Sequence, residues 1–369
     1  MIVAEAVDSL GVEYSAEILR QAQQIWEHTE FLNALDVTDD DSRFDDEYVE
    51  KFLRVGITGV ALCISKCQHD FEDTLRAFLK WNRLVGSRTN LVLVRTVGDL
   101  DRALRDRKLG VFWALDRMPV IRAIEPGYIR AFGDQEDALR LLYDLGLRMS
   151  QLANYGGNVF GDGAGEPRDA GLTELGELVI RSMNELGITV DLAHAGHRTC
   201  LEAIDTSEFP VVISHAGCRA LTSHPRNIDD DVIAKAAARG GMIGLDLIGN
   251  HILVGGGPYR QPTIEDWLRH LDHVVELVGI DYVGFGPDSK NRSYTWEGSD
   301  RGMRAAFPRF FESEGRLGPK GELGFVKGMT NPLTWPAIFP ALLARGYTRE
   351  DIGKVMGGNF RRVLTATWH

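Results

Sequence analysis

The sequence is poor in cysteine and has neither a long hydrophobic run nor a leader-like start. Four cysteines among 369 residues are too few for a disulfide framework and suit a reducing cytosol. The longest apolar runs, such as 58–65 and 109–115, fall well short of the roughly 18 residues that a membrane helix requires. The N-terminal MIVAEAVDSL lacks the basic start and apolar stretch of a secretory signal. We therefore expect a cytoplasmic protein without a membrane partner.

Basic charge is also scarce. The 41 Lys and Arg residues are outnumbered by 53 Asp and Glu residues, which gives a formal net charge of −12 with neutral histidines. The chain has no block of Lys or Arg, whereas nonspecific nucleic-acid binding depends on clustered cations that displace counterions. These features exclude nucleic acid as an expected partner and favour a small-molecule substrate.

Short β-rich runs alternate with longer amphipathic runs along almost the whole chain. In the predicted helix 172–186, apolar side chains recur at spacings of three and four residues on one stripe. This alternation is typical of parallel strands connected by helices, and one (β/α)8 TIM-type barrel commonly uses a chain of this length. We predict an α/β fold with a single barrel domain over residues 1–369 and a lid insertion at about 288–328. The predicted strands are 2–7, 59–65, 91–95, 109–116, 149–153, 189–194, 211–215, 242–247 and 282–288.

Four of these strands end in an aspartate or a histidine. The runs LGVFWALD, VDLAH, VVISH and YVGFGPD end in Asp116, His194, His215 and Asp288. In a barrel enzyme the chemistry lies at the C-terminal ends of the strands. All four side chains are therefore expected at that end of the barrel, which we call its mouth. Taken alone, each is more often a hydrogen-bonded structural histidine or a helix N-cap aspartate. Their convergence is what indicates a site.

The four residue types suit metal chemistry. Two neutral imidazoles and one or two carboxylates are good ligands for zinc or a similar divalent ion. Three protein ligands leave a position for water, which loses a proton near neutral pH and becomes a nucleophile. This arrangement predicts hydrolysis of an amide or ester. If Asp288 is not a ligand, it can act as general base or hold a substrate ammonium group.

Four segments of the chain carry a resemblance to a known family. GITVDLAHAGHRTCLEAI, FPVVISHAGCRALTSHPRNIDDDVI, DYVGFGPD and ARGYTREDIGKVMGGNFRRVL resemble the membrane (renal) dipeptidase family, peptidase family M19. The resemblance runs from roughly residue 108 to the C-terminus. It implies a barrel of the metal-dependent hydrolase type, a dipeptide or amino-acid derivative as substrate, and a homodimer.

The resemblance also implies roles for individual residues. His194 and His215 match the ligands of one zinc ion, and Asp116 falls where the family has a glutamate that bridges two metals. Arg226 matches the arginine that binds the substrate carboxylate. Asp288 matches the aspartate that completes the other metal site and contacts the substrate amine.

Two of the implied positions depart from the family pattern. Asp116 is about one methylene shorter than the bridging glutamate, so it reaches less far toward two metals. Asn154 stands at or near the position of the family's substrate-polarising histidine. The loop around it, NVFGDGAGEPRDAGL, is similar to a bacterial branch of the family.

The first strand holds the largest departure. Family members carry His-x-Asp at its end, where both side chains bind the first metal. In the present chain, one alignment places Leu10 and Val12 there, and another places Ala6 and Asp8. Carboxylates alone do not reproduce a zinc shell of nitrogen and oxygen ligands, so we expect one zinc ion or none. A rebuilt first site would have to use Asp8, Glu5 or Glu13.

These observations give one leading function and two alternatives. The leading prediction is a zinc-dependent, dipeptidase-like hydrolase that cleaves a dipeptide or small amide with a free carboxylate. The first alternative is an isomerase, lyase or cyclase acting on an amino-acid-derived metabolite with the remaining site, in which Asp288 moves a proton and Arg226 anchors a carboxylate. The second is a catalytically silent binding protein.

Overall fold

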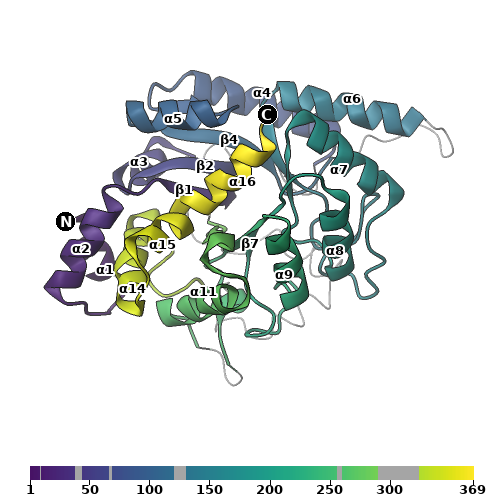
Figure 1. Ribbon diagram of the computed structural model, residues 1–369. Helices are drawn as coiled ribbons and strands as arrows, with labels where there is room; N and C mark the ends of the chain where they lie inside the picture. The colour runs from purple at the N-terminus through teal and green to yellow at the C-terminus, as the bar shows by residue number, and fades with distance from the viewer. Residues whose placement is uncertain (9, 38–43, 66–68, 120–129, 256–259, 290–323) are drawn as a thin grey trace.

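The computed structural model describes residues 1–8, 10–37, 44–65, 69–119, 130–255, 260–289 and 324–369. At its centre lies a parallel sheet (Figure 1). Its strands are β1 (Phe31–Val37), β2 (Ile57–Cys63), β3 (Leu91–Leu93), β4 (Leu109–Leu115), β5 (Leu147–Gln151), β6 (Thr189–Asp191), β7 (Val212–Ala216), β8 (Met242–Leu245) and β9 (Val283–Phe285).

The sheet curls into a nearly closed barrel. Its strands follow the order β1-β2-β4-β5-β6-β7-β8-β9, while β3 pairs with the start of β4. The two ends of this order are linked, because Asp36 in β1 bridges to Ser289 after β9 and the Val37 N–H donates to the Ser289 carbonyl at 2.8 Å. The architecture confirms the predicted (β/α)8 fold.

Helices surround the strands and begin and end at residues suited to those positions. In α7, the Thr173 hydroxyl accepts from the Gly176 N–H at 3.0 Å, and the helix ends at Gly187, whose φ of 76° favours glycine. This helix confirms the prediction for 172–186. The described helices are α1 (Ile2–Asp8), α2 (Ala16–Trp26), α3 (Asp46–Arg54), α4 (Phe71–Gly86), α5 (Val97–Asp106), α6 (Arg130–Asp144), α7 (Glu174–Leu186), α8 (His197–Thr206), α9 (Asp230–Ala238), α10 (Gly249–Ile252), α11 (Ile264–Val278), α14 (Ile338–Arg345), α15 (Arg349–Gly353) and α16 (Asn359–Thr367), with the short turns η1 (Ile280–Tyr282), η2 (Pro332–Ala337) and η3 (Lys354–Gly358).

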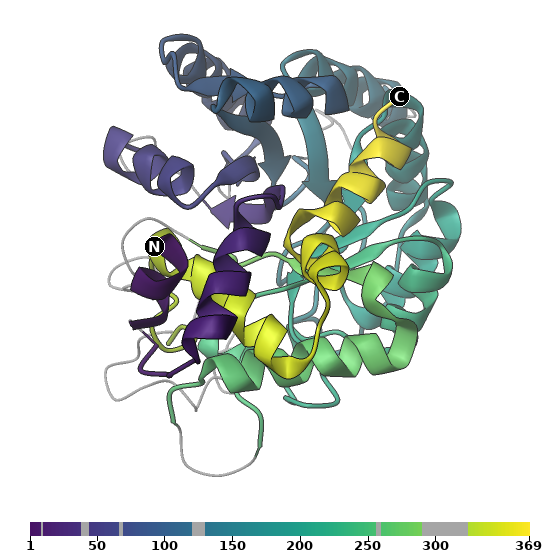
Figure 2. The same cartoon turned by 60° about the vertical axis from the view of Figure 1, so that its left-hand side comes forward.

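The N-terminal segment differs from the sequence prediction. Residues 2–7, predicted as the first strand, lie in helix α1, and the first strand is β1. Figure 2 shows α1 and α2 (purple) beside the C-terminal part of the chain (yellow) rather than in the barrel, with α1 packed on η2 and α2 on α14. The buried side chains of the segment recur at spacings of three and four residues, which is the pattern of one helix face: Val3, Ala6, Val7 and Leu10.

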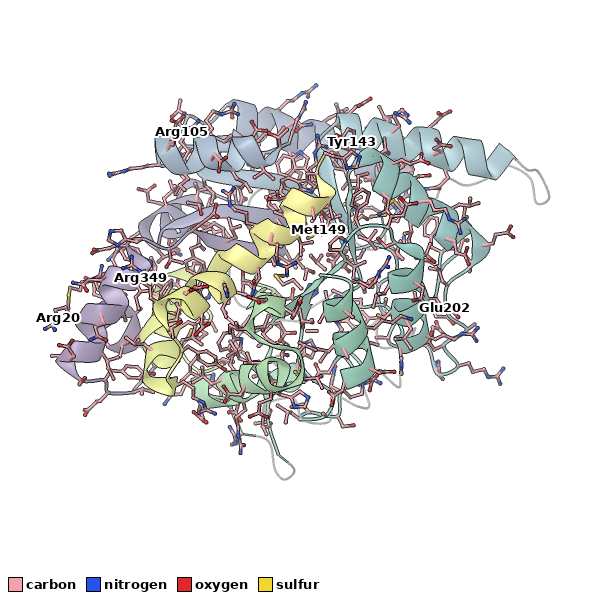
Figure 3. All side chains as sticks on the ribbon, in the orientation of Figure 1. Arg20, Arg105, Tyr143, Met149, Glu202 and Arg349 are labelled. Atoms are coloured by element: carbon pink, nitrogen blue, oxygen red, sulfur yellow. The ribbon has the colours of Figure 1, made fainter. Side chains whose placement is uncertain are left out.

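Helix α16 covers the end of the barrel where the strands begin. In Figure 1 it crosses the ring of strands and helices, and in Figure 3 Met149 lies inside that ring while Arg20, Arg105 and Glu202 lie at its edge. The Arg362 guanidinium donates to the Asp281 carbonyl, just before β9, at 2.7 Å. Three side chains of α16 share one buried cluster with the barrel interior: Phe360, Val363 and Leu364 with Leu32, Ala61, Phe112, Met149, Val212 and Met242. The opposite end, where the strands finish, is therefore the place to look for a site.

None of the described helices combines the length and the apolar character needed to cross a membrane. Most of the segment predicted as a lid, 288–328, lies outside the described residues.

Candidate functional site

His194 and His215 lie at the ends of neighbouring strands and face each other. His194 follows β6, His215 lies in β7, and both are buried. Their Nε2 atoms are 3.1 Å apart. Two imidazole nitrogens bound to one tetrahedral zinc ion lie about 3.3 Å apart, since each zinc–nitrogen bond is about 2.0–2.1 Å long. The pair therefore has the separation expected for two ligands of a single ion.

The charge state of both imidazoles also fits metal binding. Burial lowers the pKa of His194 and of His215 well below the usual value, and the positive charge of Arg226 lowers both further. Neutral imidazole is the form that binds metals. His194 is held in the left-handed region with φ of 68°, and the ring of Tyr155 packs edge-on against it at 4.6 Å between centroids.

A polar chain that the sequence prediction missed orients His215. Its Nδ1 lies 2.8 Å from the Ser214 hydroxyl, which in turn donates to the Asp191 carboxylate at 2.5 Å. With Nδ1 engaged in this way, Nε2 is the ring nitrogen directed to His194. Asp191 and Ser214 are polar residues that directly follow the apolar Val190 and Ile213 near the ends of their strands, and that signal could have identified them.

The other predicted carboxylates do not join this pair as close ligands. Among the residues that the structure describes, no three Cys, His, Asp or Glu side chains are near enough to share a metal ion. Asp116, after β4, instead lies at Cys63 on β2. The pKa of that buried thiol is raised well above its usual value, first by burial and then by the Asp116 carboxylate, with which it shares a hydrogen bond. The described part of the site thus brings two metal ligands together, His194 and His215.

Arg226 presents an incompletely paired guanidinium in the interior of the molecule. The side chain is only 1% exposed, and its Nη2 donates to the His215 carbonyl at 2.7 Å. Its Nε and Nη1 have no hydrogen-bond partner among the described residues. A buried cation with free donors is costly unless an anion pairs with it. The predicted substrate carboxylate would supply that anion.

Asp288 lies after β9 and is buried in a strained conformation. Its φ of 51° is in the left-handed region, which only a few non-glycine residues here adopt. Burial raises its pKa to about 7, the Asp246 carboxylate raises it as well, and Arg226 opposes both. A carboxyl group that titrates near neutral pH is well suited to accept a proton during catalysis.

Two amide side chains lie at the end of β5 and just after it, near the same mouth. The Asn154 Oδ1 accepts from the Tyr155 N–H at 2.9 Å, so this predicted substrate-binding residue also shapes its own turn. Gln151 was not predicted. It ends β5, is fully buried, and neither atom of its amide has a partner within the described part of the chain.

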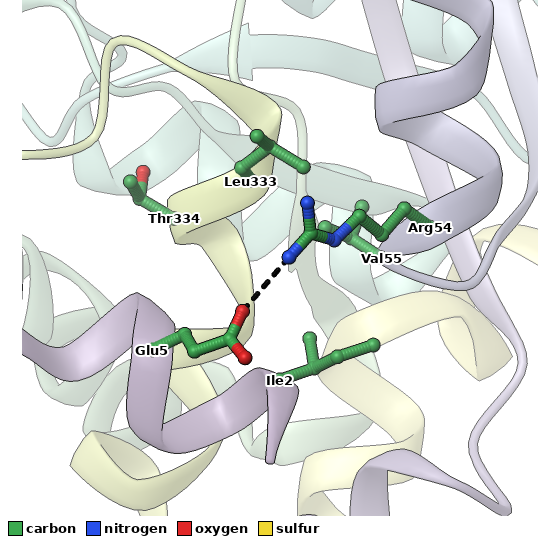
Figure 4. Close-up of a pocket in the computed structure, with 6 residues that line it drawn as sticks. All are labelled: Ile2, Glu5, Arg54, Val55, Leu333 and Thr334. Atoms are coloured by element: carbon green, nitrogen blue, oxygen red, sulfur yellow. Dashed lines mark hydrogen bonds and ion pairs between the residues drawn. The ribbon is translucent and has the colours of Figure 1, made fainter.

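The N-terminal residues proposed for a first metal site lie elsewhere. The positions compared with His-x-Asp (Leu10, Val12, Ala6 and Asp8) lie in or just after α1, so both alignments were wrong. Glu5 pairs with Arg54 at 2.9 Å in a surface pocket that Ile2, Val55, Leu333 and Thr334 also line (Figure 4). Arg54 precedes the start of β2, so this pocket lies at the opposite end of the barrel from the histidines.

The true first strand brings no histidine to the mouth. β1 has the sequence FLNALDV. Its one carboxylate, Asp36, accepts hydrogen bonds from two hydroxyl groups. Tyr48 donates to Asp36 at 2.7 Å, and Ser289 donates to the same oxygen. Asp36 therefore helps to hold β1 against the segment after β9, which leaves His194 and His215 as the histidine pair of the site.

Comparison with known proteins gives a consistent family. The family model described as "Membrane dipeptidase (Peptidase family M19)" matches residues 42–300 of the chain. Dipeptidase tcpJ of Claviceps purpurea is 29% identical over 238 residues, which are 64% of this chain and 48% of that protein. An uncharacterized dipeptidase of Schizosaccharomyces pombe, C965.12, is 36% identical over 154 residues, 41% of this chain and 36% of its own length. The chain spans about half or less of the length of these curated relatives.

Solved structures agree with the fold. An amidohydrolase from Pseudomonas aeruginosa superposes with a TM-score of 0.77 at 25% identity, over 94% of this chain and 99% of that one. A metallo peptidase from Rhodobacter sphaeroides, liganded with a phosphinate mimic of the dipeptide L-Ala-D-Ala, superposes with a TM-score of 0.71 at 20% identity, over 92% of this chain and 99% of that one. Since the family match covers well over half of the sequence, the chain belongs to the membrane dipeptidase family, peptidase family M19.

Proposed function

We propose that this chain is a dipeptidase-like hydrolase that cleaves a dipeptide, or a small amide with a free carboxylate, with the help of one zinc ion. The observation that carries the proposal is the buried pair His194 and His215, whose Nε2 atoms are 3.1 Å apart. The Arg226 guanidinium, with two unpartnered nitrogens, lies close enough to lower the pKa of both. Membership of a family whose named relatives are dipeptidases supports the same reaction class.

The proposed metal would be held by His194 and His215. Their nitrogen donors suit zinc better than magnesium or calcium, which prefer oxygen. The predicted carboxylates Asp116 and Asp288 are not near enough to share an ion with the pair in this structure, so the proposed ion rests on the two histidines. When bound, the ion lowers the pKa of water and polarises a carbonyl.

The remaining groups bind and orient the substrate. Arg226 pairs with the substrate carboxylate and thereby fixes the peptide relative to the histidines. Asp288 accepts a proton from the attacking water or holds the substrate ammonium group. Gln151 offers an unpaired buried amide that can donate to the carbonyl oxygen as negative charge develops on it.

Hydrolysis in labelled water tests this proposal. L-Ala-L-Ala and L-Ala-D-Ala are incubated with the purified chain in H2(18)O, and free alanine is analysed by mass spectrometry. We expect one 18O atom in the newly formed carboxylate. His194→Gln should abolish the reaction, whereas His197→Gln, at an exposed histidine paired with Asp231, should retain it. Turnover without 18O incorporation would contradict hydrolysis, and equal activity of His194→Gln would contradict the assigned site.

A further inference from the structure

A third histidine in the mouth is paired with a carboxylate and has no assigned role. Asp246 directly follows β8, and His251 lies in the short helix α10. The His251 Nδ1 is 2.7 Å from an Asp246 oxygen, and both side chains are at least 95% buried. A second Asp246 oxygen accepts from the Ile248 N–H at 3.0 Å. The carboxylate is therefore fixed in place before it meets the imidazole.

This pair is tied to the site of His215 and Arg226. The Asn227 side chain donates to the His251 carbonyl at 2.8 Å and accepts from the Gly217 N–H at 3.1 Å. Asn227 follows Arg226, and Gly217 lies two residues after His215, so α10 packs directly on the loop after β7. The same proximity is seen in the charges: after burial, which is the larger cause in both cases, Arg226 lowers the pKa of His251 and Asp246 raises the pKa of Asp288.

The hydrogen bonding of His251 differs from that of a structural histidine. Burial raises the pKa of Asp246 to about 7, and above that pH its carboxylate only accepts, so the His251 Nδ1 carries the proton between them. The Nε2 of His251 is bonded to none of the described residues. His270, also buried nearby, uses both nitrogens on backbone groups, with the Cys218 N–H at 2.8 Å and the Ile252 carbonyl at 3.1 Å. An imidazole held by a carboxylate through one nitrogen, with the other nitrogen available, is the arrangement of a general acid or base.

We propose that His251, oriented by Asp246, is a catalytic residue that protonates the departing amine of the substrate. The inference rests on the hydrolase function proposed above and adds the proton donor to it. As the C–N bond breaks, its electron pair stays on nitrogen and takes the Nε2 proton of the His251 imidazolium. The imidazole then recovers a proton from solvent, while the proton lost by the attacking water returns to solvent. The net reaction is amide plus water to carboxylate plus protonated amine.

The bound substrate creates the conditions for this step. Burial first, and the charge of Arg226 second, disfavour the protonated form of His251 in the free protein, and the substrate carboxylate neutralises Arg226. Asp246 then remains as the nearest charge to the imidazolium and stabilises it. Asp288 is left to serve the attacking water or the substrate ammonium group.

The test compares two substrates that differ in the leaving group. One is L-Ala-L-Ala or L-Ala-D-Ala, whichever the wild type cleaves faster. The other is the L-alanyl ester of 4-hydroxybenzoic acid, which keeps a free carboxylate and whose phenolate leaves without a proton. The variants are His251→Gln and Asp246→Asn, the latter keeping the imidazole. His273→Gln is the matched control, because His273 forms a similar pair with Asp230 at 2.8 Å on the outside of the barrel.

We expect His251→Gln to lower kcat for the dipeptide by roughly 100-fold or more, as for loss of a general acid. The aryl ester should lose less than about 10-fold, and Asp246→Asn should act in the same direction. Equal losses on both substrates, or no loss on the dipeptide, would overturn the assignment and indicate a structural pair. A wild type that cleaves neither substrate would instead refute the hydrolase function, and His251's role with it.

Discussion

At the scale of single residues, Asp288 combines an unfavourable backbone with an unfavourable charge. Its φ is 51°, and burial together with Asp246 raises its pKa to about 7. Strained conformations and displaced pKa values gather at functional sites, where the rest of the fold holds them in place. Asp288 should therefore lower the free energy of unfolding of the protein.

This cost has a defined pH dependence. Because the folded pKa is raised from 3.8 to about 7, the folded state binds more protons than the unfolded state within that window. The stabilising effect of the protonated form is present below about pH 4 and is lost as the pH rises through 7. In chelator-treated protein we predict that Asp288→Asn is more stable than the wild type at pH 8 by about 1–3 kcal/mol, although it loses activity.

Urea unfolding at pH 5 and pH 8 measures this effect. The difference in unfolding free energy between Asp288→Asn and the wild type should grow from the lower to the higher pH. A variant that is equally stable at pH 8 would show that Asp288 is not held against an unfavourable charge.

Arg226 should determine recognition of the substrate carboxylate. Its Nε and Nη1 have no partner among the described residues, so a bound carboxylate gains hydrogen bonds that no protein group has to give up. We predict that Arg226→Lys, which keeps the charge but loses the fork, raises KM for a dipeptide by about 10-fold or more. The same variant should change KM for the C-terminally amidated dipeptide by less than about threefold.

Steady-state kinetics with both substrates provides the comparison. Arg198→Lys, at an exposed arginine paired with Glu202, is the matched control and should leave both KM values unchanged. Equal increases for the acid and the amide would mean that Arg226 supports the loop through the His215 carbonyl rather than binding a carboxylate.

At the scale of elements, the strands that carry function were the easier ones to predict. β6 and β7 read as apolar runs that end in a histidine, and the structure places both histidines together. β1 was missed because Asn33 and Asp36, both buried, interrupt its apolar pattern. α1 was taken for a strand because its seven residues are too few for periodicity to separate a helix from a strand.

Contacts between distant segments could not be predicted in this way. The closure of β1 on β9 depends on Tyr48 and Ser289 sharing Asp36, which no local pattern reveals. The same is true of His251, which is a candidate catalytic residue only because Asp246 and Arg226 lie close to it. Sequence spacing identifies strand ends, whereas these pairings depend on how the barrel brings them together.

Helix α16 should be essential for barrel stability although it contributes no site residue. Phe360 is 2% exposed, and its ring lies 6.0 Å from that of Phe112 inside the barrel. We predict that Phe360→Ala lowers the unfolding free energy by about 3–5 kcal/mol. Leu104→Ala, at a leucine that is 45% exposed on α5, should cost about 0.5 kcal/mol or less.

Thermal or urea unfolding followed by circular dichroism measures both variants. If Phe360→Ala unfolds at the same temperature or urea concentration as the wild type, α16 does not stabilise the barrel. The cluster that it shares with the barrel is then not part of the core.

At the scale of the whole molecule, the barrel collects at one end groups that lie far apart in the sequence. His194, His215, Asp246 and Asp288 lie at the ends of four consecutive strands of the barrel, β6 to β9. The guanidinium of Arg226 acts on all four electrostatically. The opposite end is covered by α16. This polarity brings the raised carboxyl pKa values of Asp246 and Asp288 and the unpartnered nitrogens of Gln151 and Arg226 to one mouth.

The central claim is that this mouth holds one metal ion on His194 and His215. It is tested most directly by the zinc content of the purified chain, measured by mass spectrometry after zinc loading and removal of the excess by gel filtration. The account predicts about one zinc ion per wild-type chain and close to none in His194→Gln and His215→Gln, with His197→Gln like the wild type. Two ions per chain, or an unchanged zinc content in both site variants, would contradict it.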